Sequence, residues 1–495
     1  MGRLAGDRLS GLDASFLHLE DDSAHMHVAG VMLFEGDPPP YDDLVAAVES
    51  RLHLVPRYRQ KLAFVPLNQG RPRWVDDPHL NLRYHIRATA LPPPGGEDQL
   101  RALAGRVFSQ RLDRDKPLWE MWLVGGLEGG RFALLSKTHH ALVDGVSGVD
   151  IASVLFDLDP DPPQGAAPGE SWIARPVPSG SELLAEALVE RVTAPSEIAR
   201  SARALFRAPR RVAGEAVNTL TSMGALARAG FRAPPPSPYN VPLGTHRSFT
   251  WVRASLSDIK AIKNELGGTV NDVVLATVTG ALRRHLRRRG VDTDGLELRA
   301  LVPVSVRAED EHGALGNRVA AMMAPLPVYC GDPRETLAVV REAMGDLKES
   351  GQAVGAQRLT ELAGFAPPTI LAQATRLGMR RRLFNLVVTN VPGPQLPLYM
   401  LGHQLRDIVP MVPLARNQAL GVAIMSYDGA INFGLVGCFD AMPDLEDLAA
   451  DFEASLEGLA EAAGVSLSPS PPAGGAPRME PASAGVGAVA ASPTA

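Results

Sequence analysis

Two adjacent histidines are followed at a fixed short spacing by an aspartate and a glycine: His139 and His140 precede Asp144 and Gly145. Histidine can take up a proton and return it near neutral pH, which makes it the usual general base for activating a hydroxyl group. The preceding run, residues 131–138, predicts a β-strand, so the histidines lie at a strand end. Gly145 relieves steric crowding where the chain bends after them. The motif therefore indicates a catalytic turn.

Two other interpretations of this motif stay open. In the first, one histidine is a hydrogen-bonded core residue and Asp144 is a helix cap. The second is a metal site, which is disfavoured because adjacent imidazoles on an extended strand point apart. In addition, no cysteine or third histidine lies near the pair in the sequence. We therefore expect no metal ion at this motif.

Composition limits the classes of partner and compartment. The formal net charge of the 495 residues is -6, which argues against nucleic acid as the main partner. The two cysteines, Cys330 and Cys438, indicate no disulfide framework and fit a reducing cytosol. No N-terminal signal peptide is recognisable, and no uncharged apolar run reaches the roughly 18 residues of a membrane span. We expect a cytoplasmic protein.

Patterning divides the chain into four parts. Residues 1–158 alternate strand-like and helix-like runs and predict a first α/β lobe that carries the histidine motif. Residues 159–245 begin as a linker rich in proline, glycine and alanine and continue as basic amphipathic helices. Residues 246–466 predict a second lobe of strands and helices. Residues 467–495 are rich in alanine, proline, serine and glycine, which predicts disorder.

The basic part of the second region, residues 191–232, has an unusual charge. It contains eight arginines and two glutamates and neither lysine nor aspartate, so its net charge is +6. Apolar residues are interspersed among the arginines, a pattern typical of a helix that lies on an anionic lipid surface. A solvated helix that packs against the lobes is an equal alternative. The first interpretation predicts peripheral association with the inner membrane or with lipid droplets.

Five further blocks occur along the chain, at residues 12–16, 25–28, 117–120, 267–276 and 389–394. Together with the histidine motif, they resemble the blocks of the bacterial wax ester synthase/diacylglycerol acyltransferases, in the same order. The chain is more distantly similar to nonribosomal peptide condensation domains and chloramphenicol acetyltransferase. The first two blocks look like the family's opening strand. The resemblance implies an α/β fold of two chloramphenicol-acetyltransferase-like lobes, with the active site in the tunnel between them.

The resemblance also implies roles for the residues of the motif. The second histidine, His140, would be the general base, and His139 would support it. Asp144 resembles the family's structural aspartate, which pairs with an arginine and holds the loop. Arg307 is the candidate partner of that aspartate.

Ester formation from a thioester also needs a donor to the tetrahedral oxyanion. Thr269 and Asp272 fit a capping box, which places Asn271 in the first turn of a helix. Free backbone N–H groups and the positive end of the helix dipole favour negative charge there, so Asn271 is the candidate. Alternatively, Asn271 and Asp272 only begin the helix. Candidates for the substrate channel are Pro117, Leu118, Trp119, Glu120 and Asp272.

The histidine motif and the family resemblance together predict an O-acyltransferase. The resemblance implies acyl-CoA as co-substrate, diacylglycerol or a long-chain alcohol as acceptor, and no cofactor. Alternatives are a condensation-type acyltransferase of secondary metabolism and a lipid-body protein without turnover, against which the intact His140, Asp144 and Asn271 count. The sequence contains no Gly-x-Ser-x-Gly elbow, dinucleotide-binding glycine motif or Walker loop, which argues against hydrolase, nicotinamide and ATP chemistry.

Overall fold

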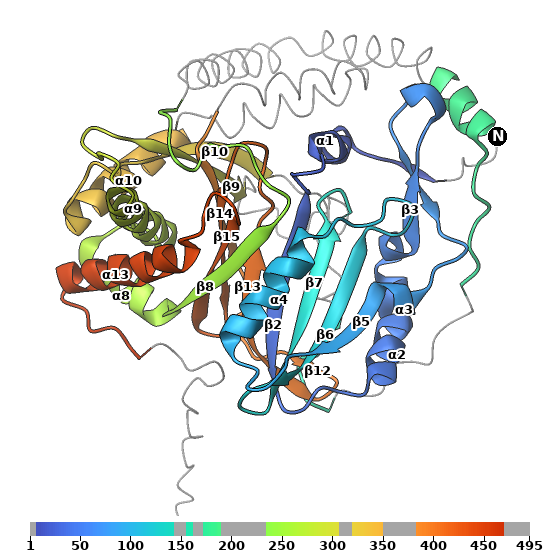
Figure 1. Cartoon of the computed structure of the whole chain (residues 1–495), viewed down its shortest axis with the longest axis horizontal. Coiled ribbons are helices and arrows are strands. Elements are labelled where there is room, and N and C mark those ends of the chain that lie inside the picture. Colours follow the sequence, from blue (N-terminus) through green and yellow to red (C-terminus); the bar gives the residue numbers. More distant parts are fainter. Residues whose placement is uncertain are drawn as a thin grey trace, which may run out of the picture.

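The computed structural model describes residues 6–142, 155–161, 172–189, 234–305, 319–349 and 383–469. Two lobes lie side by side, and each is built on a six-stranded sheet (Figure 1). A small three-stranded sheet formed by β1 (Asp7–Arg8), β4 (Arg73–Asp76) and β3 (Gln60–Ala63) adjoins the first lobe. The mixed α/β fold of two lobes agrees with the fold class predicted from the sequence.

The sheet of the first lobe has the strand order β12-β13-β2-β7-β6-β5. Strand β7 lies between β2 and β6 and is antiparallel to both. Its neighbours therefore hold the end of β7 on two sides. The strands are β2 (His27–Glu35), β5 (Ile86–Ala90), β6 (Trp119–Leu127), β7 (Arg131–His139), β12 (Tyr399–Met400) and β13 (His403–Met411).

The sheet of the second lobe has the strand order β10-β9-β11-β14-β15-β8. Its strands β14 and β15 are almost entirely buried, which is expected of strands covered on both faces. Strand β11 runs parallel to both of its neighbours. The strands are β8 (Arg247–Ser255), β9 (Leu298–Ser305), β10 (Val319–Leu326), β11 (Leu386–Pro392), β14 (Leu420–Tyr427) and β15 (Ala430–Cys438).

Helices cover the faces of both sheets. Alternate residues of β2 and β7 fall into two apolar clusters, one shared with α2 (Tyr41–Arg51) and the other with α4 (Glu97–Ser109). Because strand side chains alternate between faces, these two helices cover opposite faces of the first sheet. The remaining helical segments are α1 (Gly11–Leu19), α3 (Leu82–His85), α8 (Leu256–Leu266), α9 (Val270–Arg288), α10 (Pro333–Glu349), α13 (Leu445–Ala463) and the 3-10 turns Leu52–Leu54, Pro56–Arg59 and Pro66–Asn68.

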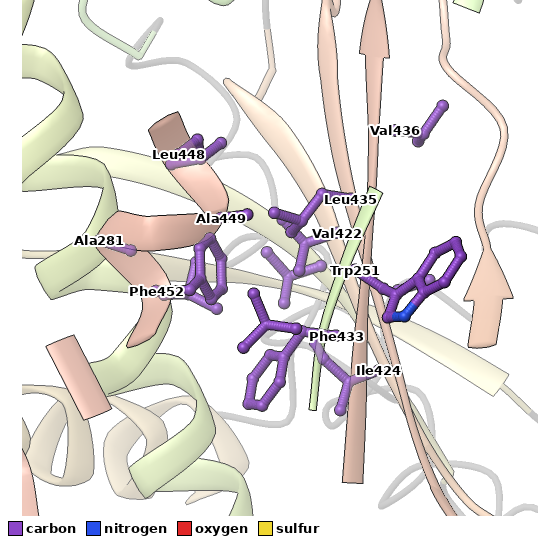
Figure 2. Packing of buried hydrophobic residues seen from close by; sticks show 14 of the residues in the cluster. Trp251, Ala281, Val422, Ile424, Phe433, Leu435, Val436, Leu448, Ala449 and Phe452 are labelled. Carbon is purple, nitrogen blue, oxygen red and sulfur yellow. The ribbon is translucent and has the colours of Figure 1, made fainter. Parts of the chain in front are cut away.

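The core of the second lobe forms between its sheet and α13. In Figure 2, Phe433 and Leu435 of β15 point toward Phe452 of α13, and the two phenylalanine rings lie 5.7 Å apart. Trp251 of β8 points to the other side of the strands. There the guanidinium of Arg101, on α4, lies over its ring at 4.7 Å. Helix α4 therefore packs against both sheets and joins the lobes.

The first sheet also contains strands from the C-terminal part of the chain. Strand β13 pairs antiparallel with β2, although the two are separated by most of the sequence. It also passes close to β15 at Gly434, where a Cβ atom would lie 1.9 Å from the carbonyl oxygen of Pro410. Only glycine allows this approach of the two backbones. The connection thus ties the first sheet to the second.

The strand predicted at residues 131–138 is confirmed as β7, and one expectation from the family resemblance is corrected. Residues 12–16 were expected in an opening strand and instead lie in helix α1, because Ser10 caps that helix by accepting a hydrogen bond from the backbone N–H of Asp13. The expected capping box of α9 is complete, with Thr269 and Asp272 bonded to each other's backbone N–H. Ser255 caps α8 in a similar way, because its side chain accepts a hydrogen bond from the backbone N–H of Asp258.

Candidate active site

The two histidines of the motif lie where β7 ends. His139 is the last residue of the strand and is paired with His27 of β2. Its backbone N–H donates to the carbonyl of Leu118 at 2.9 Å, and the N–H of His140 donates to the carbonyl of Met26 at 2.7 Å. Both backbones are therefore fixed by the residues that immediately precede β6 and β2, as the prediction of a strand end requires.

The side chain of His139 is buried and its tautomer is defined. Nδ1 accepts a hydrogen bond of 3.0 Å from the backbone N–H of Ala141. A backbone N–H can only donate, so the proton of the neutral ring is on Nε2, which faces Glu20 Oε1 at 3.8 Å. Burial lowers the pKa of His139 to about 3, although the negative charge of Glu20 acts in the opposite direction. His139 is thus a neutral hydrogen-bonded residue near pH 7.

His140 has a different environment. Its side chain is half-buried, and its ring stacks on Phe16 of α1 with 4.0 Å between centroids and an angle of 21° between planes. Helix α1 therefore lies over the end of β7 (Figure 1). The adjacent histidines differ in exposure, and the more exposed one is the residue predicted to act as base.

Glu20, the residue that follows α1, was not identified from the sequence. Its side chain is 3% exposed, and its Oε1 lies 3.4 Å from Nε2 of His27. Arg114 contacts its Oε2 through two guanidinium nitrogens, and Arg111 lies 3.8 Å away. Burial alone would raise the pKa of Glu20, but the hydrogen bond from His27 and the nearby positive charges of the cluster hold it well below its usual range.

The imidazoles beside Glu20 form a contiguous group. The rings of His25 and His27 have centroids 5.5 Å apart, and those of His27 and His139 are 5.8 Å apart. Burial lowers the pKa of His27 and lowers that of His25 to about 4. The group is therefore neutral near pH 7, which leaves Glu20 and its arginines as its charged members.

Residues 117–120 lie at the start of β6, next to the histidines. The indole of Trp119 is buried, donates from Nε1 to the carbonyl of Tyr58 at 2.9 Å and stacks on His85. Glu120 is buried and forms an ion pair of 2.5 Å with Lys137 of β7. Trp119 and Glu120 therefore pack and pair beside the motif.

Lys137, which sequence analysis also missed, connects this pair to α4. Its Nζ donates to the backbone carbonyls of Val107 and Gln110 at 2.9 Å each, at the C-terminal end of α4. A cation stabilises that end of a helix because the last carbonyls lack partners there. The buried Glu120–Lys137 pair therefore positions α4 against β7.

A cavity of about 360 Å³ opens beside residues 117–120. Its lining includes Pro117, Trp119 and Glu120, together with the basic side chains of Arg87, Arg111 and Lys116. That three residues of the block line a cavity is compatible with their predicted place in a substrate channel.

The candidate oxyanion donor lies in the second lobe. Asn271 is the second residue of α9, and its Oδ1 accepts a hydrogen bond of 3.3 Å from Nδ2 of Asn390, on β11. With its oxygen engaged, the amide nitrogen of Asn271 is left to donate. Asp272, also a predicted channel residue, uses Oδ2 to accept from the backbone and hydroxyl of Thr269. Asn390 was not predicted as a partner.

Asp144, Gly145 and Arg307 lie outside the described residues. The structure therefore brings together His139, His140 and the block at residues 117–120 in the first lobe, and it joins Asn271 to a partner in the second.

Comparison with known proteins identifies the family. A model described as the wax ester synthase/diacylglycerol acyltransferase catalytic domain matches residues 9–274, and one described as the WS/DGAT C-terminal domain matches residues 315–460. The chain belongs to the wax ester synthase/diacylglycerol acyltransferase family. Membership confirms the resemblance inferred from the sequence blocks and makes the protein an acyltransferase of lipid metabolism by family.

Two relatives of this family member come from Mycobacterium tuberculosis. One, named a putative diacylglycerol O-acyltransferase, is 35% identical over 476 residues, which cover 93% of this chain and 91% of the relative. Another, named a probable diacylglycerol O-acyltransferase, is 31% identical over 463 residues, which cover 90% and 94% of the two chains.

Solved structures support the fold of the acyltransferase. The wax ester synthase/diacylglycerol acyltransferase of Marinobacter aquaeolei is similar with a TM-score of 0.64 and 28% identity, over 93% of this chain and 100% of that one. The first condensation domain of the calcium-dependent antibiotic synthetase has a TM-score of 0.57 at 16% identity, over 93% and 97%. At that identity the second likeness concerns the fold alone.

The buried imidazole of His139 predicts a pH-dependent stability. The unfolded chain protonates His139 below about pH 6.5, whereas the folded protein does so only near pH 3, so acidification favours unfolding. Between pH 7 and pH 5 this single group should cost about 2 kcal/mol of the free energy of unfolding. Urea denaturation at both pH values should show that His139→Gln loses about 2 kcal/mol less than the wild type. Equal losses in the two proteins would contradict the neutral, buried state of His139.

Proposed function

We propose that this acyltransferase moves a long-chain acyl group from acyl-CoA to the free hydroxyl of diacylglycerol, producing triacylglycerol, and that it also accepts long-chain alcohols to form wax esters. The observation that carries the proposal is the pair of histidines at the end of β7, one buried and hydrogen-bonded and the other half-buried. The names of the Mycobacterium and Marinobacter relatives support the acceptors. A rhizomide synthetase condensation domain of similar fold, described in complex with C8-CoA, supports a CoA-bound donor.

In the proposed reaction, His140 removes the proton of the acceptor hydroxyl as its oxygen attacks the thioester carbonyl carbon. The resulting tetrahedral oxyanion accepts a hydrogen bond from the side-chain amide of Asn271. When the intermediate collapses, the carbon–sulfur bond breaks, and the protonated His140 returns its proton to the departing CoA thiolate. Asp144 and Arg307 would hold the loop after the histidines through an ion pair, and no cofactor takes part.

The assignment of the base to His140 rests on the contrast with its neighbour. Nδ1 of His139 is occupied by a backbone N–H, and its Nε2 carries the proton that faces Glu20. Its pKa of about 3 makes it a poor proton acceptor near neutral pH. His140 is more exposed than His139, and its ring is stacked on Phe16.

The function is tested by acyl transfer with purified protein. Labelled palmitoyl-CoA is incubated with diacylglycerol or hexadecanol as separate acceptors, and the labelled ester is measured. We expect ester from both, and we expect His140→Ala to lower kcat by about 100-fold or more, because general base catalysis is lost. His139→Ala should be milder, since it removes support rather than the base.

Circular dichroism and thermal unfolding serve as controls that each variant is folded. Wild-type protein that forms no ester with either acceptor would contradict the proposed function. Equal activity of the His139 and His140 variants would contradict only the assignment of the base.

The oxyanion role of Asn271 leads to a separate prediction. Asn271→Ala should lower kcat by about 100-fold while changing the KM for acyl-CoA little, because the lost hydrogen bond forms mainly in the transition state. Asn390→Ala, which removes the amide that holds Asn271, should reduce kcat less. Steady-state kinetics of both variants check this. An effect confined to KM would show that Asn271 binds substrate instead.

We also propose that the enzyme works at the surface of the membrane or of lipid droplets, because its acceptors are insoluble. In the described part of the chain, no helix has the length and apolar character of a membrane span. The basic segment, residues 191–232, lies outside the described residues. The support that it gives to the proposal is its sequence, which has a net charge of +6 and apolar residues among its arginines.

Replacing Arg203, Arg207, Arg210 and Arg211 with glutamine should reduce binding to anionic vesicles, since each arginine near the surface contributes about 1 kcal/mol. Activity on dispersed diacylglycerol should fall with it, whereas turnover of a short soluble alcohol should not. Unchanged co-sedimentation with vesicles would place the docking surface elsewhere.

A further inference from the structure

One turn of helix contacts both histidines of the motif. Phe16 and Glu20 are four residues apart at the end of α1, and the N–H of Glu20 donates to the carbonyl of Phe16. Residues at this spacing lie on the same side of a helix. Phe16 stacks on the ring of His140, and Glu20 faces Nε2 of His139. The end of α1 therefore sets the positions of the two neighbouring rings together.

The two oxygens of Glu20 have different partners. Oε1 faces the imidazoles, at 3.4 Å from His27 and 3.8 Å from His139. Oε2 faces the arginines of the segment after α4, with Arg114 in direct contact and Arg111 at 3.8 Å. A carboxylate this buried is stable as an ion only when it is paired, and the arginines supply that charge. The imidazoles can then remain neutral, with the Nε2 atoms of His27 and His139 facing Oε1.

We propose that Glu20 is a positioning residue for acyl transfer: its carboxylate fixes the Nε2-protonated ring of His139 and, through the end of α1, holds His140 in the orientation in which it accepts a proton. This inference rests on the proposed function, because it assigns the base to His140. It adds a residue that touches neither substrate nor the reacting atoms. In catalytic triads, an acidic residue orients the imidazole of the base itself. Here the acidic residue faces His139, the neighbour of the proposed base.

A purely structural role for Glu20 would have a different consequence. Loss of a buried ion pair lowers the stability and the amount of folded enzyme, but each folded molecule keeps its kinetics. A positioning role changes kcat of the folded enzyme. Removing a negative charge near the histidine pair also makes protonation of the base less favourable, so the acidic limb of the kcat profile moves to lower pH. The charged groups that face Glu20 are Arg111 and Arg114, and its titratable neighbours are His25, His27 and His139.

The test compares Glu20→Gln with Glu20→Asp and with a matched control. The control is Glu186→Gln, which removes a carboxylate of 14% exposure that pairs with Arg73 at 3.1 Å, outside the histidine cluster. Each protein is assayed with palmitoyl-CoA and diacylglycerol from pH 5 to pH 9, and rates are normalised to the folded fraction.

We expect Glu20→Gln to lower kcat by about tenfold or more, with both KM values within about twofold and the acidic limb displaced to lower pH. Glu20→Asp, which retains the charge, should recover part of kcat and the wild-type limb, and Glu186→Gln should match the wild type. Wild-type kcat and pH profile in Glu20→Gln, after normalisation, would overturn the proposal. If Glu20→Gln does not fold, Glu20→Asp decides: it must show reduced kcat, and wild-type kinetics would overturn the proposal.

A second readout does not need turnover. In 15N-edited NMR spectra of the wild-type protein, His139 should show a slowly exchanging Nε2–H signal, because that proton is buried and faces the carboxylate. Glu20→Gln should shift this signal and speed its exchange with water, and Glu186→Gln should not. An unchanged signal in Glu20→Gln would overturn the positioning role, whether or not the wild-type protein acylates an acceptor. Failure of the wild-type protein to acylate any acceptor would instead count against the proposed function.

Discussion

The burial of one carboxylate constrains the arrangement of the first lobe around the histidine pair. Glu20 is almost inaccessible to water, so its charge must be paired within the protein. Arg114 supplies that pairing from the segment that connects α4 to β6, and the imidazoles of His27 and His139 supply the remaining contacts from β2 and β7. Helix α1, two neighbouring strands and a loop are thereby held in one arrangement. The half-buried ring of His140 belongs to the same arrangement through Phe16.

Local sequence signals predicted much of this region, but not its long-range contacts. The strand that ends in His139 follows from its apolar run, and the start of α9 follows from the capping box of Thr269 and Asp272. The family resemblance placed residues 12–16 in a strand, whereas the cap at Ser10 begins helix α1 there. Glu20 could not be found in this way, since it meets Arg114 across 94 positions of sequence. One local signal could have placed Glu20 beside Phe16: after the cap at Ser10, the two residues are four positions apart, a spacing that puts them on one side of a helix.

The composition of the sheets shows a second limit of local patterns. Strand β13 was not predicted from the sequence; its residues alternate in burial, but such alternation cannot specify which sheet a strand joins. The structure places it beside β2, and the missing side chain of Gly434 lets it pass close to β15. Glycine inside a strand is a sign of such close approach. That sign indicates where two backbones meet, but it does not name the partner.

The division of roles between the adjacent histidines follows from their environments rather than from their chemistry, which is identical. A buried ring whose Nδ1 accepts from a backbone amide loses its capacity to act as a base near pH 7, and it gains a fixed direction for its remaining proton. The neighbouring ring of His140 is half-buried, and its stacking on Phe16 defines its plane. Two successive residues at a strand end can differ in this way because their backbones bond to the residues that precede two different strands, Leu118 before β6 and Met26 before β2.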